Sequence, residues 1–168
     1  MKRTVAGIAI TWIRFAIFLI AACAGPVWAE SGKVTHVTDG DTFWVRLAGG
    51  GKPVPVRIDG IDAPEICQAG GQAARAALAS RVARRTVTLA VRRHDDYGRA
   101  VASVRVGGED IAGWMVGQGH AWSYHYGREG GPYLKLQGQA QAARKGLFSD
   151  PHALAPRFFR KQHGSCHP

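Results

Sequence analysis

The fold is decided by one stretch of the chain, Val56-Arg-Ile-Asp-Gly-Ile-Asp-Ala-Pro-Glu65. Its β-branched apolar residues predict a strand over residues 54–61, and the proline near its end turns the chain away from that strand. Arg57 stands inside the apolar part, where a charged side chain needs a partner because burying a lone charge is costly. That partner is either a nearby aspartate, Asp59 or Asp62, or a bound phosphate.

Five strands and three helices are predicted around and including this stretch. Alternating and β-branched segments predict strands at residues 34–37, 42–47, 54–61, 86–92 and 99–106. Helical spacing of apolar residues predicts helices at 72–85, 109–118 and 133–145. The residues from 156 onward have the composition of an extended basic tail. We therefore expect an α+β fold, a five-stranded OB-fold β-barrel with three packed helices.

The size and charge of the chain suit one globular domain with a polyanionic partner. The 168 residues carry a formal net charge of +10, and the apolar fraction is that of a globular protein. A basic surface favours and speeds the encounter with nucleic acid. Charge alone also fits a basic exported protein that binds no nucleic acid, so the sequence motifs have to distinguish the two.

The first 29 residues have the pattern of a signal peptide. Basic residues, the last of them Arg14, precede an apolar run at 15–24, and small residues end the segment at Ala29. The apolar run is too short for a stable membrane span, although an uncleaved anchor is an alternative. After cleavage, 19 basic and 12 acidic residues remain, a net charge of +7. We expect a secreted or periplasmic protein. A lipobox-like Ile20-Ala-Ala-Cys23 offers the alternative of a lipid anchor at Cys23.

The remaining cysteines, Cys67 and Cys166, form an even pair in a chain expected to be exported. An oxidising compartment favours a disulfide between them, and two free thiols are the alternative. A zinc site is disfavoured, because the histidines beside Cys166 have no second ligand pair at zinc spacing. The mature chain divides into a barrel domain at 30–150 and a basic tail at 151–168.

Three short runs carry the chemistry: Asp39-Gly-Asp-Thr42, the stretch that ends at Glu65, and Asp95-Asp-Tyr-Gly-Arg99. Clustered carboxylates bind a hard divalent cation, and arginines bind a phosphate through a planar fork of donors. A metal, a general base and two phosphate-binding groups are what phosphodiester hydrolysis needs. Each run also has a structural interpretation: an Asp-Gly turn, a solvated acidic loop, and an ion pair of Arg99 with Asp95 or Asp96.

In their combination and order, these runs resemble the staphylococcal nuclease (thermonuclease) family over residues 34–150. The resemblance implies an OB-type barrel with three helices and a calcium-dependent phosphodiesterase that acts on DNA and RNA. Besides the three runs above, the segments that carry it are Val116-Gly-Gln-Gly-His-Ala121 and Gln139-Ala-Gln-Ala-Ala-Arg-Lys-Gly-Leu-Phe148.

Taken residue by residue, the resemblance implies a Ca²⁺ site and a general base. Asp41 and Asp62 match the aspartates that ligate calcium in the family. The main-chain carbonyl of Ala63 matches the third protein ligand, at a position where the best-known member has threonine. Glu65 matches the glutamate that orients or deprotonates the attacking water.

The same resemblance implies how the substrate is held. Arg57 and Arg99 match the two arginines that hold the scissile phosphate and stabilise the transition state. Tyr97, Tyr124 and Tyr126 are candidate substrate-binding residues, with surface loop aromatics as the alternative for the last two.

The expected function is thus an exported, calcium-dependent endonuclease of low sequence specificity, acting as a monomer. One alternative is a catalytically weak or inactive OB-fold protein that only binds nucleic acid. Another is a surface lipoprotein with an attachment role, which depends on Cys23.

Overall fold

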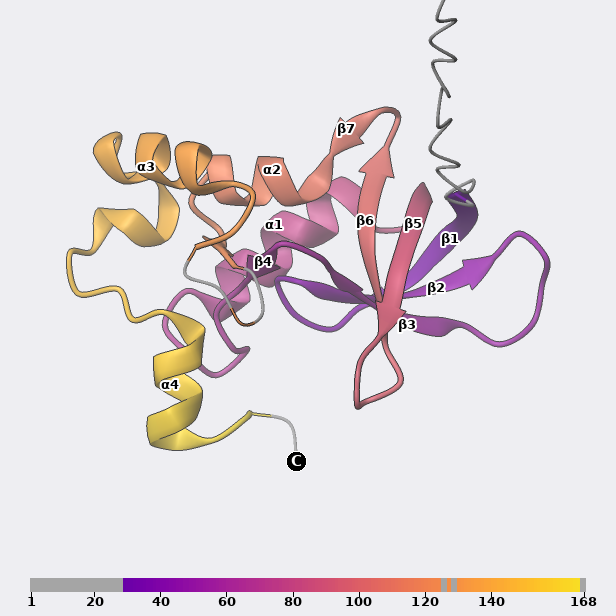
Figure 1. Cartoon of the computed structure of the whole chain (residues 1–168), viewed down its shortest axis with the longest axis horizontal. Helices are drawn as coiled ribbons and strands as arrows, with labels where there is room; N and C mark the ends of the chain where they lie inside the picture. The colour runs from indigo at the N-terminus through magenta and orange to yellow at the C-terminus, as the bar shows by residue number, and fades with distance from the viewer. Residues whose placement is uncertain (1–28, 125–126, 128–129, 167–168) are drawn as a thin grey trace, which may run out of the picture.

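A computed structural model describes residues 29–124, 127 and 130–166, and its core is a closed five-stranded barrel (Figure 1). The barrel strands are β1 (Ala29–Val37), β2 (Thr42–Leu47), β3 (Val54–Ile58), β5 (Thr86–His94) and β6 (Ala100–Val106). They pair in the order β3-β2-β1-β5-β6, and a parallel pairing of β3 with β6 closes the ring. The expected α+β class and OB-type barrel are confirmed.

The barrel interior is filled by the alternate, inward-facing residues of these strands. Pairing brings Thr42 opposite Arg57 on one side of β3 and Val101 opposite Arg57 on the other, so β3 is held from both sides. The largest fully buried side chains contributed by the barrel strands are Phe43, Val45, Val56, Ile58, Val87, Leu89 and Val104.

Three helices gather at one side of the barrel, where Figure 1 shows α1, α2 and α3 close together. They span Gly71–Val82, Ile111–Gly117 and Leu134–Ala142, near the predicted ranges, and a 3₁₀ turn follows at Gly146–Ser149. Leu78 and Met115 are fully buried and join the barrel residues in one apolar core. This attachment fixes the loop between β4 and α1, which carries Glu65.

The single strand predicted at 54–61 is wrong, because it is broken at Asp59-Gly60. Gly60 has a φ of 83°, a left-handed conformation that ends β3. The chain resumes as β4 (Ile61–Asp62), which pairs with the short β8 (Trp122–Ser123) instead of a barrel strand. The break therefore carries Asp62 out of the barrel sheet.

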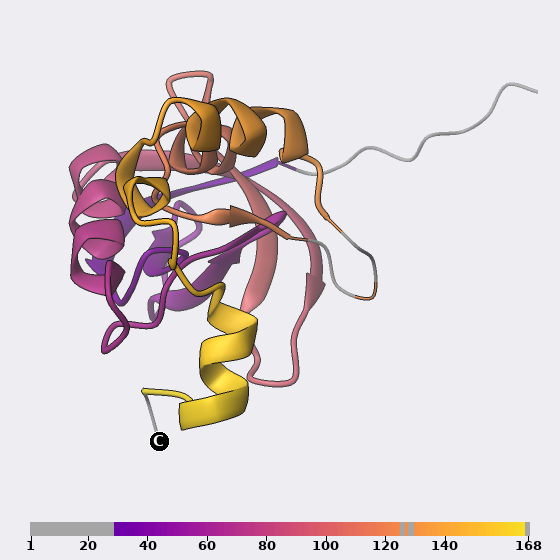
Figure 2. The ribbon, with the colours of Figure 1, turned by 90° about the vertical axis from the view of Figure 1, so that its left-hand side faces the viewer.

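Two further predictions differ from the structure. The first two residues of the helix predicted at 109–118 form a short strand, β7 (Glu109–Asp110), which pairs with β6 before α2 begins. The tail from residue 156 is not extended: α4 (Pro156–His163) is a fourth helix, separate from the other three in the ribbon (Figure 2). Pro156 opens α4 at a position where its missing N–H is not needed.

Two glycines test this packing in opposite directions. A Cβ on Gly40 would lie 2.7 Å from the Cβ atoms of both Ala63 and Ala74, so we expect Gly40→Ala to lower the free energy of unfolding by roughly 1–3 kcal/mol. Gly138 lies in α3 with nothing within 4 Å of such a Cβ. There the same change should raise stability by about 0.5–1 kcal/mol, because alanine favours helix. Urea unfolding of both variants measures the difference, and equal effects would contradict this packing.

Candidate functional site

Arg57 lies at the centre of a buried cluster of charges. Its Nη1 is 2.8 Å from Oδ1 of Asp41, and its Nη2 is 2.9 Å from Oδ1 of Asp62. Both carboxylates are almost completely buried, and the arginine side chain is 20% exposed. Arg57 thus joins the turn before β2 to β4. Of the two aspartates expected as its partner, Asp62 is bound, whereas Asp59 lies 3.2 Å from Arg92. The ion pair with Asp41 is the one that the local sequence did not suggest.

Asp41 is held from several directions at once. Its Oδ1 also accepts a hydrogen bond from the hydroxyl of Thr42, and its Oδ2 accepts one from the amide of Ala63 at 2.9 Å. Burial by itself would raise the pKa of Asp41, but Arg57 and these donors lower it below its usual 3.8. Asp41 is therefore ionised in the folded protein. The backbone of Ala63, a candidate metal-ligating residue, lies directly against this carboxylate.

The other two aspartates of the cluster have the opposite tendency. Burial, reinforced by the charge of Asp41, raises the pKa of Asp39 to about 7. Burial also raises the pKa of Asp62, although hydrogen bonds and charge from Arg160 and Arg57 oppose the rise. An additional cation placed among crowded, desolvated carboxylates stabilises their ionised form. The site therefore has an excess of negative charge.

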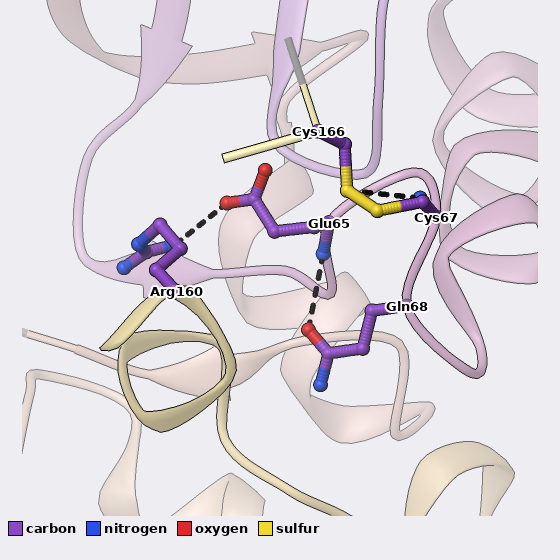
Figure 3. The surroundings of a disulfide bond; sticks show 5 residues. All are labelled: Glu65, Cys67, Gln68, Arg160 and Cys166. Carbon is purple, nitrogen blue, oxygen red and sulfur yellow. Dashed lines mark hydrogen bonds and ion pairs between the residues drawn. A yellow bond between two sulfur atoms is a disulfide. The ribbon is translucent and has the colours of Figure 1, made fainter. Parts of the chain in front are cut away.

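Glu65 lies beside this cluster and contacts the last helix (Figure 3). Its Oε1 is 2.9 Å from Nη1 of Arg160, and the same arginine makes bonds of 3.2 and 3.0 Å to the two carboxylate oxygens of Asp62. The amide of Glu65 donates to the side chain of Gln68, whose Nε2 donates in turn to the carbonyl of Leu154. Glu65 is thus held between the loop that carries it and the approach to α4.

Arg99 does not join the charge cluster through any contact of the described chain. Its Nε lies 2.8 Å from Oδ2 of Asp95, and its guanidinium stacks 5.2 Å from the ring of Tyr97. It immediately precedes β6, whose Val101 pairs with Arg57. Since residues two apart share a face of a strand, Arg99 and Arg57 project to the same side of this sheet. The register therefore brings the two arginines into one region, some distance apart.

The candidate tyrosines are separated. Tyr97 is 82% exposed at the β5–β6 turn. Tyr124 follows β8, its amide bonded to the carbonyl of Gly60, and it lines a cavity of about 190 Å³ together with Asp62. Tyr126 lies outside the described residues. Of the two candidate tyrosines that the structure describes, Tyr124 is the one next to a charged residue of the cluster.

Cys67 and Cys166 form a disulfide, with Cα atoms 5.9 Å apart. The amide of Cys67 also donates a hydrogen bond to the sulfur of Cys166 (Figure 3). The bond joins residues 99 apart in sequence and ties the segment after α4 to the loop that follows Glu65.

The donor chemistry of the cluster suits a hard divalent cation. Asp41, Asp62 and Glu65 offer only oxygen atoms, the ligands that Ca²⁺ prefers. Within the described ranges, no three acidic, histidine or cysteine side chains converge as a ready set of metal ligands. Instead, a nitrogen of Arg160 lies between the oxygens of Asp62 and Glu65. The residue types therefore suit such a cation. In this structure the guanidinium of Arg160 lies between two of the carboxylates instead.

Two residues of this site were missed from the sequence, Arg160 and Gln68. Arg160 lies in the segment interpreted as a basic tail, and its position 98 residues after Asp62 gives no local signal. Gln68 is buried and bridges Glu65 to Leu154. A chain that pairs Cys67 with Cys166 must return its C-terminus to this loop, and that pairing was the available hint.

The fold and these motifs define a small barrel with a nuclease-like site, and the comparison with known families agrees. The model of the family described as "Staphylococcal nuclease homologue" matches residues 55–150. The chain therefore belongs to the family of staphylococcal nuclease homologues.

Relatives with different names cover most of the chain. "Protein ParB" of Escherichia coli is 40% identical over an alignment of 159 residues, and the match covers 88% of this chain and 89% of that protein. An "Uncharacterized endonuclease" of Haemophilus influenzae is 38% identical over 130 residues, 77% of this chain and 72% of its own length. "Micrococcal nuclease" of Shigella flexneri is 34% identical over 173 residues, 96% of each. Nuclease names among these relatives support a hydrolase that cleaves nucleic acid.

Replacing Arg57 should destabilise the fold, because the buried carboxylates would lose their counter-charge. We expect Arg57→Gln to lower the free energy of unfolding at pH 7 by about 3–5 kcal/mol, measured in EDTA, because two buried acids lose their counter-charge. The lowered pKa of Asp41 means that its ion pair stabilises the fold above pH 4 and loses this effect in more acidic solution. The difference from the wild type should therefore shrink as the pH falls.

Arg99→Gln is the matched control, because it removes an ion pair that is more exposed. Its cost should be about 1 kcal/mol or less. An Arg57→Gln variant as stable as the Arg99→Gln variant at pH 7 would contradict the central role of Arg57.

Proposed function

We propose that this chain is an exported endonuclease that hydrolyses phosphodiester bonds of DNA and RNA with low sequence specificity and requires Ca²⁺. The observation that carries the proposal is that Arg57 binds both Asp41 and Asp62, while Arg160 joins Asp62 to Glu65. Membership of the nuclease family and the basic charge of the chain support it. Ca²⁺ bound at the carboxylates would supply electrostatic stabilisation of the phosphoryl group and lower the pKa of a nearby water.

The residues of the chain have distinct roles in this proposal. Asp41 and Asp62, with the backbone of Ala63, hold the cation. Glu65 lies beside Asp62 at the partly exposed margin of the cluster, where it can accept a proton from the attacking water.

The arginines act on the phosphate. Arg57 and Arg99 share a face of the β3–β6 pair, so both can address one phosphodiester that lies across it. They neutralise the negative charge that develops on the phosphoryl oxygens in the transition state.

Tyr124 lines the cavity next to Asp62 and offers a ring against which a neighbouring base can stack.

The first test is degradation of single-stranded DNA with Ca²⁺ and with EGTA, by wild type and Glu65→Gln. We expect Ca²⁺-dependent cleavage that falls at least about 10²-fold in the variant, because the proton acceptor is lost. Arg57→Ala and Arg99→Ala should each lower kcat on the order of 10²-fold or more.

Glu109→Gln is the control, because Glu109 pairs with Arg81 at 3.8 Å on the surface and should leave cleavage unchanged. Undiminished turnover in Glu65→Gln would exclude the proposed base. DNA binding without cleavage under any condition would support a binding protein in place of an enzyme.

The localisation is proposed from the leader segment, of which residues 1–28 lie outside the described residues. In the part of the chain that the structure describes, no helix is long and apolar enough to cross a membrane. We propose cleavage after Ala29, which releases the barrel domain beginning at Glu30. Mass spectrometry of the mature N-terminus should give a free Glu30. A lipid-modified Cys23 at that terminus would replace release with anchoring.

A further inference from the structure

We propose that Arg160 is a built-in competitor of the divalent cation, so that helix α4 sets how tightly the carboxylate site binds it. This inference rests on the proposed function, because it takes Asp62 as a ligand of the cation and Glu65 as the base beside it. It concerns a helix that begins beyond the segment matched by the family model, which ends at residue 150.

The geometry makes the two cations mutually exclusive. Nη1 of Arg160 lies 3.2 Å from Oδ1 of Asp62 and 2.9 Å from Oε1 of Glu65, and Nη2 lies 3.0 Å from Oδ2 of Asp62. Ca²⁺ binds carboxylate oxygens at about 2.3–2.6 Å. An ion bound to the carboxylate of Asp62 would compete with the guanidinium for the same two oxygens, and its charge would repel the guanidinium. Arg160 must therefore withdraw before the ion can bind Asp62.

Arg160 is the more readily displaced of the two arginines. Arg57 lies on β3, a strand paired on both sides within the barrel, and its side chain is 20% exposed. Arg160 lies on the last helix, and its side chain is 33% exposed. α4 can move without breaking any pairing of the barrel. Arg57 therefore stays paired with the aspartates when the cation binds, whereas Arg160 can move away from them.

The position of Arg160 is built by contacts on both sides of α4. Before the helix, the buried Gln68 donates to the carbonyl of Leu154 at 2.6 Å. After the helix, the disulfide ties Cys166 to Cys67, two residues beyond Glu65. These attachments keep Arg160 at a high effective concentration next to the carboxylates and lower the entropy lost when it binds. The competition is therefore intramolecular and always present.

The same contact couples cation binding to the availability of the base. While Arg160 is in place, Oε1 of Glu65 accepts its hydrogen bond and is engaged. Withdrawal of Arg160 frees Asp62 for the cation and Glu65 for a water in one event. In a chain without bound cation, Glu65 therefore stays bonded to Arg160 and is not free to act as the base.

Calorimetric titration of Ca²⁺ into the oxidised full-length chain tests the proposal. We expect Arg160→Gln to bind Ca²⁺ about tenfold tighter than wild type or more, because a charge-assisted contact that opposes binding is removed. Arg160→Lys, a single-point cation, should fall between them. Lys161→Gln is the matched control: Lys161 is an exposed neighbour on α4 without an ion pair among the described residues, and its change should leave the affinity unaltered.

Thermal unfolding gives a second readout that does not depend on catalysis. In EDTA, Arg160→Gln should melt lower than wild type, because Asp62 and Glu65 lose a counter-charge. Added Ca²⁺ should then raise its melting temperature more than that of wild type, since tighter binding stabilises the folded state more.

The attachment of α4 is tested with Cys67→Ser/Cys166→Ser. We expect tighter Ca²⁺ binding in this double variant, and a much smaller additional effect when Arg160→Gln is already present. Circular dichroism confirms that each variant is folded before titration.

The outcomes separate this inference from the proposed function. Equal or weaker Ca²⁺ binding by Arg160→Gln would overturn the competitor role while leaving a Ca²⁺-dependent nuclease intact. Absence of Ca²⁺ binding in wild type and Arg160→Gln, with DNA cleavage that persists in EGTA, would overturn both the calcium requirement and this inference.

Discussion

The two ion pairs of Arg57 with Asp41 and Asp62 are the interaction on which the rest of the site depends. They connect three separate segments: the turn before β2, the closing strand β3, and the short β4, which lies outside the barrel sheet. Burying two carboxylates is tolerated only because one guanidinium binds both of them. The backbone supports the same junction, since the amide of Ile58 donates to the carbonyl of Asp41 at 2.9 Å. The strand that closes the barrel therefore also carries the arginine that assembles the site.

One guanidinium does not balance the negative charge that gathers there. Burial, and after it the negative charge of Asp41, raises the pKa values of Asp39 and Asp62. A second positive charge is favoured for this reason, and in this structure Arg160 supplies it. The excess negative charge that suits the cluster to a divalent cation thus also stabilises the contact with Arg160 of α4. Gln68 and the disulfide at Cys67 hold that helix through the loop that also carries Glu65.

A single backbone feature separates the barrel from the site. The left-handed Gly60 ends β3 and lets β4 pair with β8, away from the barrel sheet. Asp62 then faces Arg57 from outside the ring of strands, within reach of α4. A continuous strand over 54–61 would have kept Asp62 in the barrel ladder. The break therefore decides which side chains can meet.

Local chemistry explains what could be foreseen. The strands of the barrel follow from β-branched alternation, and the first three helices follow from the spacing of apolar residues, so their ranges are close to those observed. Arg57 was expected to need an anionic partner, an aspartate or a phosphate, because a lone buried charge is costly. The family was recognisable because its motifs are short contiguous runs, each readable without knowledge of the fold.

Other features were not foreseeable because they depend on residues that are distant in sequence. A glycine inside an apolar run does not reveal whether its φ is positive, so the break at Gly60 was hidden. The polar composition of residues 156–163 favours a tail, and α4 forms there against contacts that lie far away in the chain. By itself the sequence determined the barrel, the acidic and basic residues of the site and the family, since these depend on local pattern. Only the tertiary structure decided that Arg160 meets Asp62 and Glu65, because that contact joins residues almost 100 positions apart.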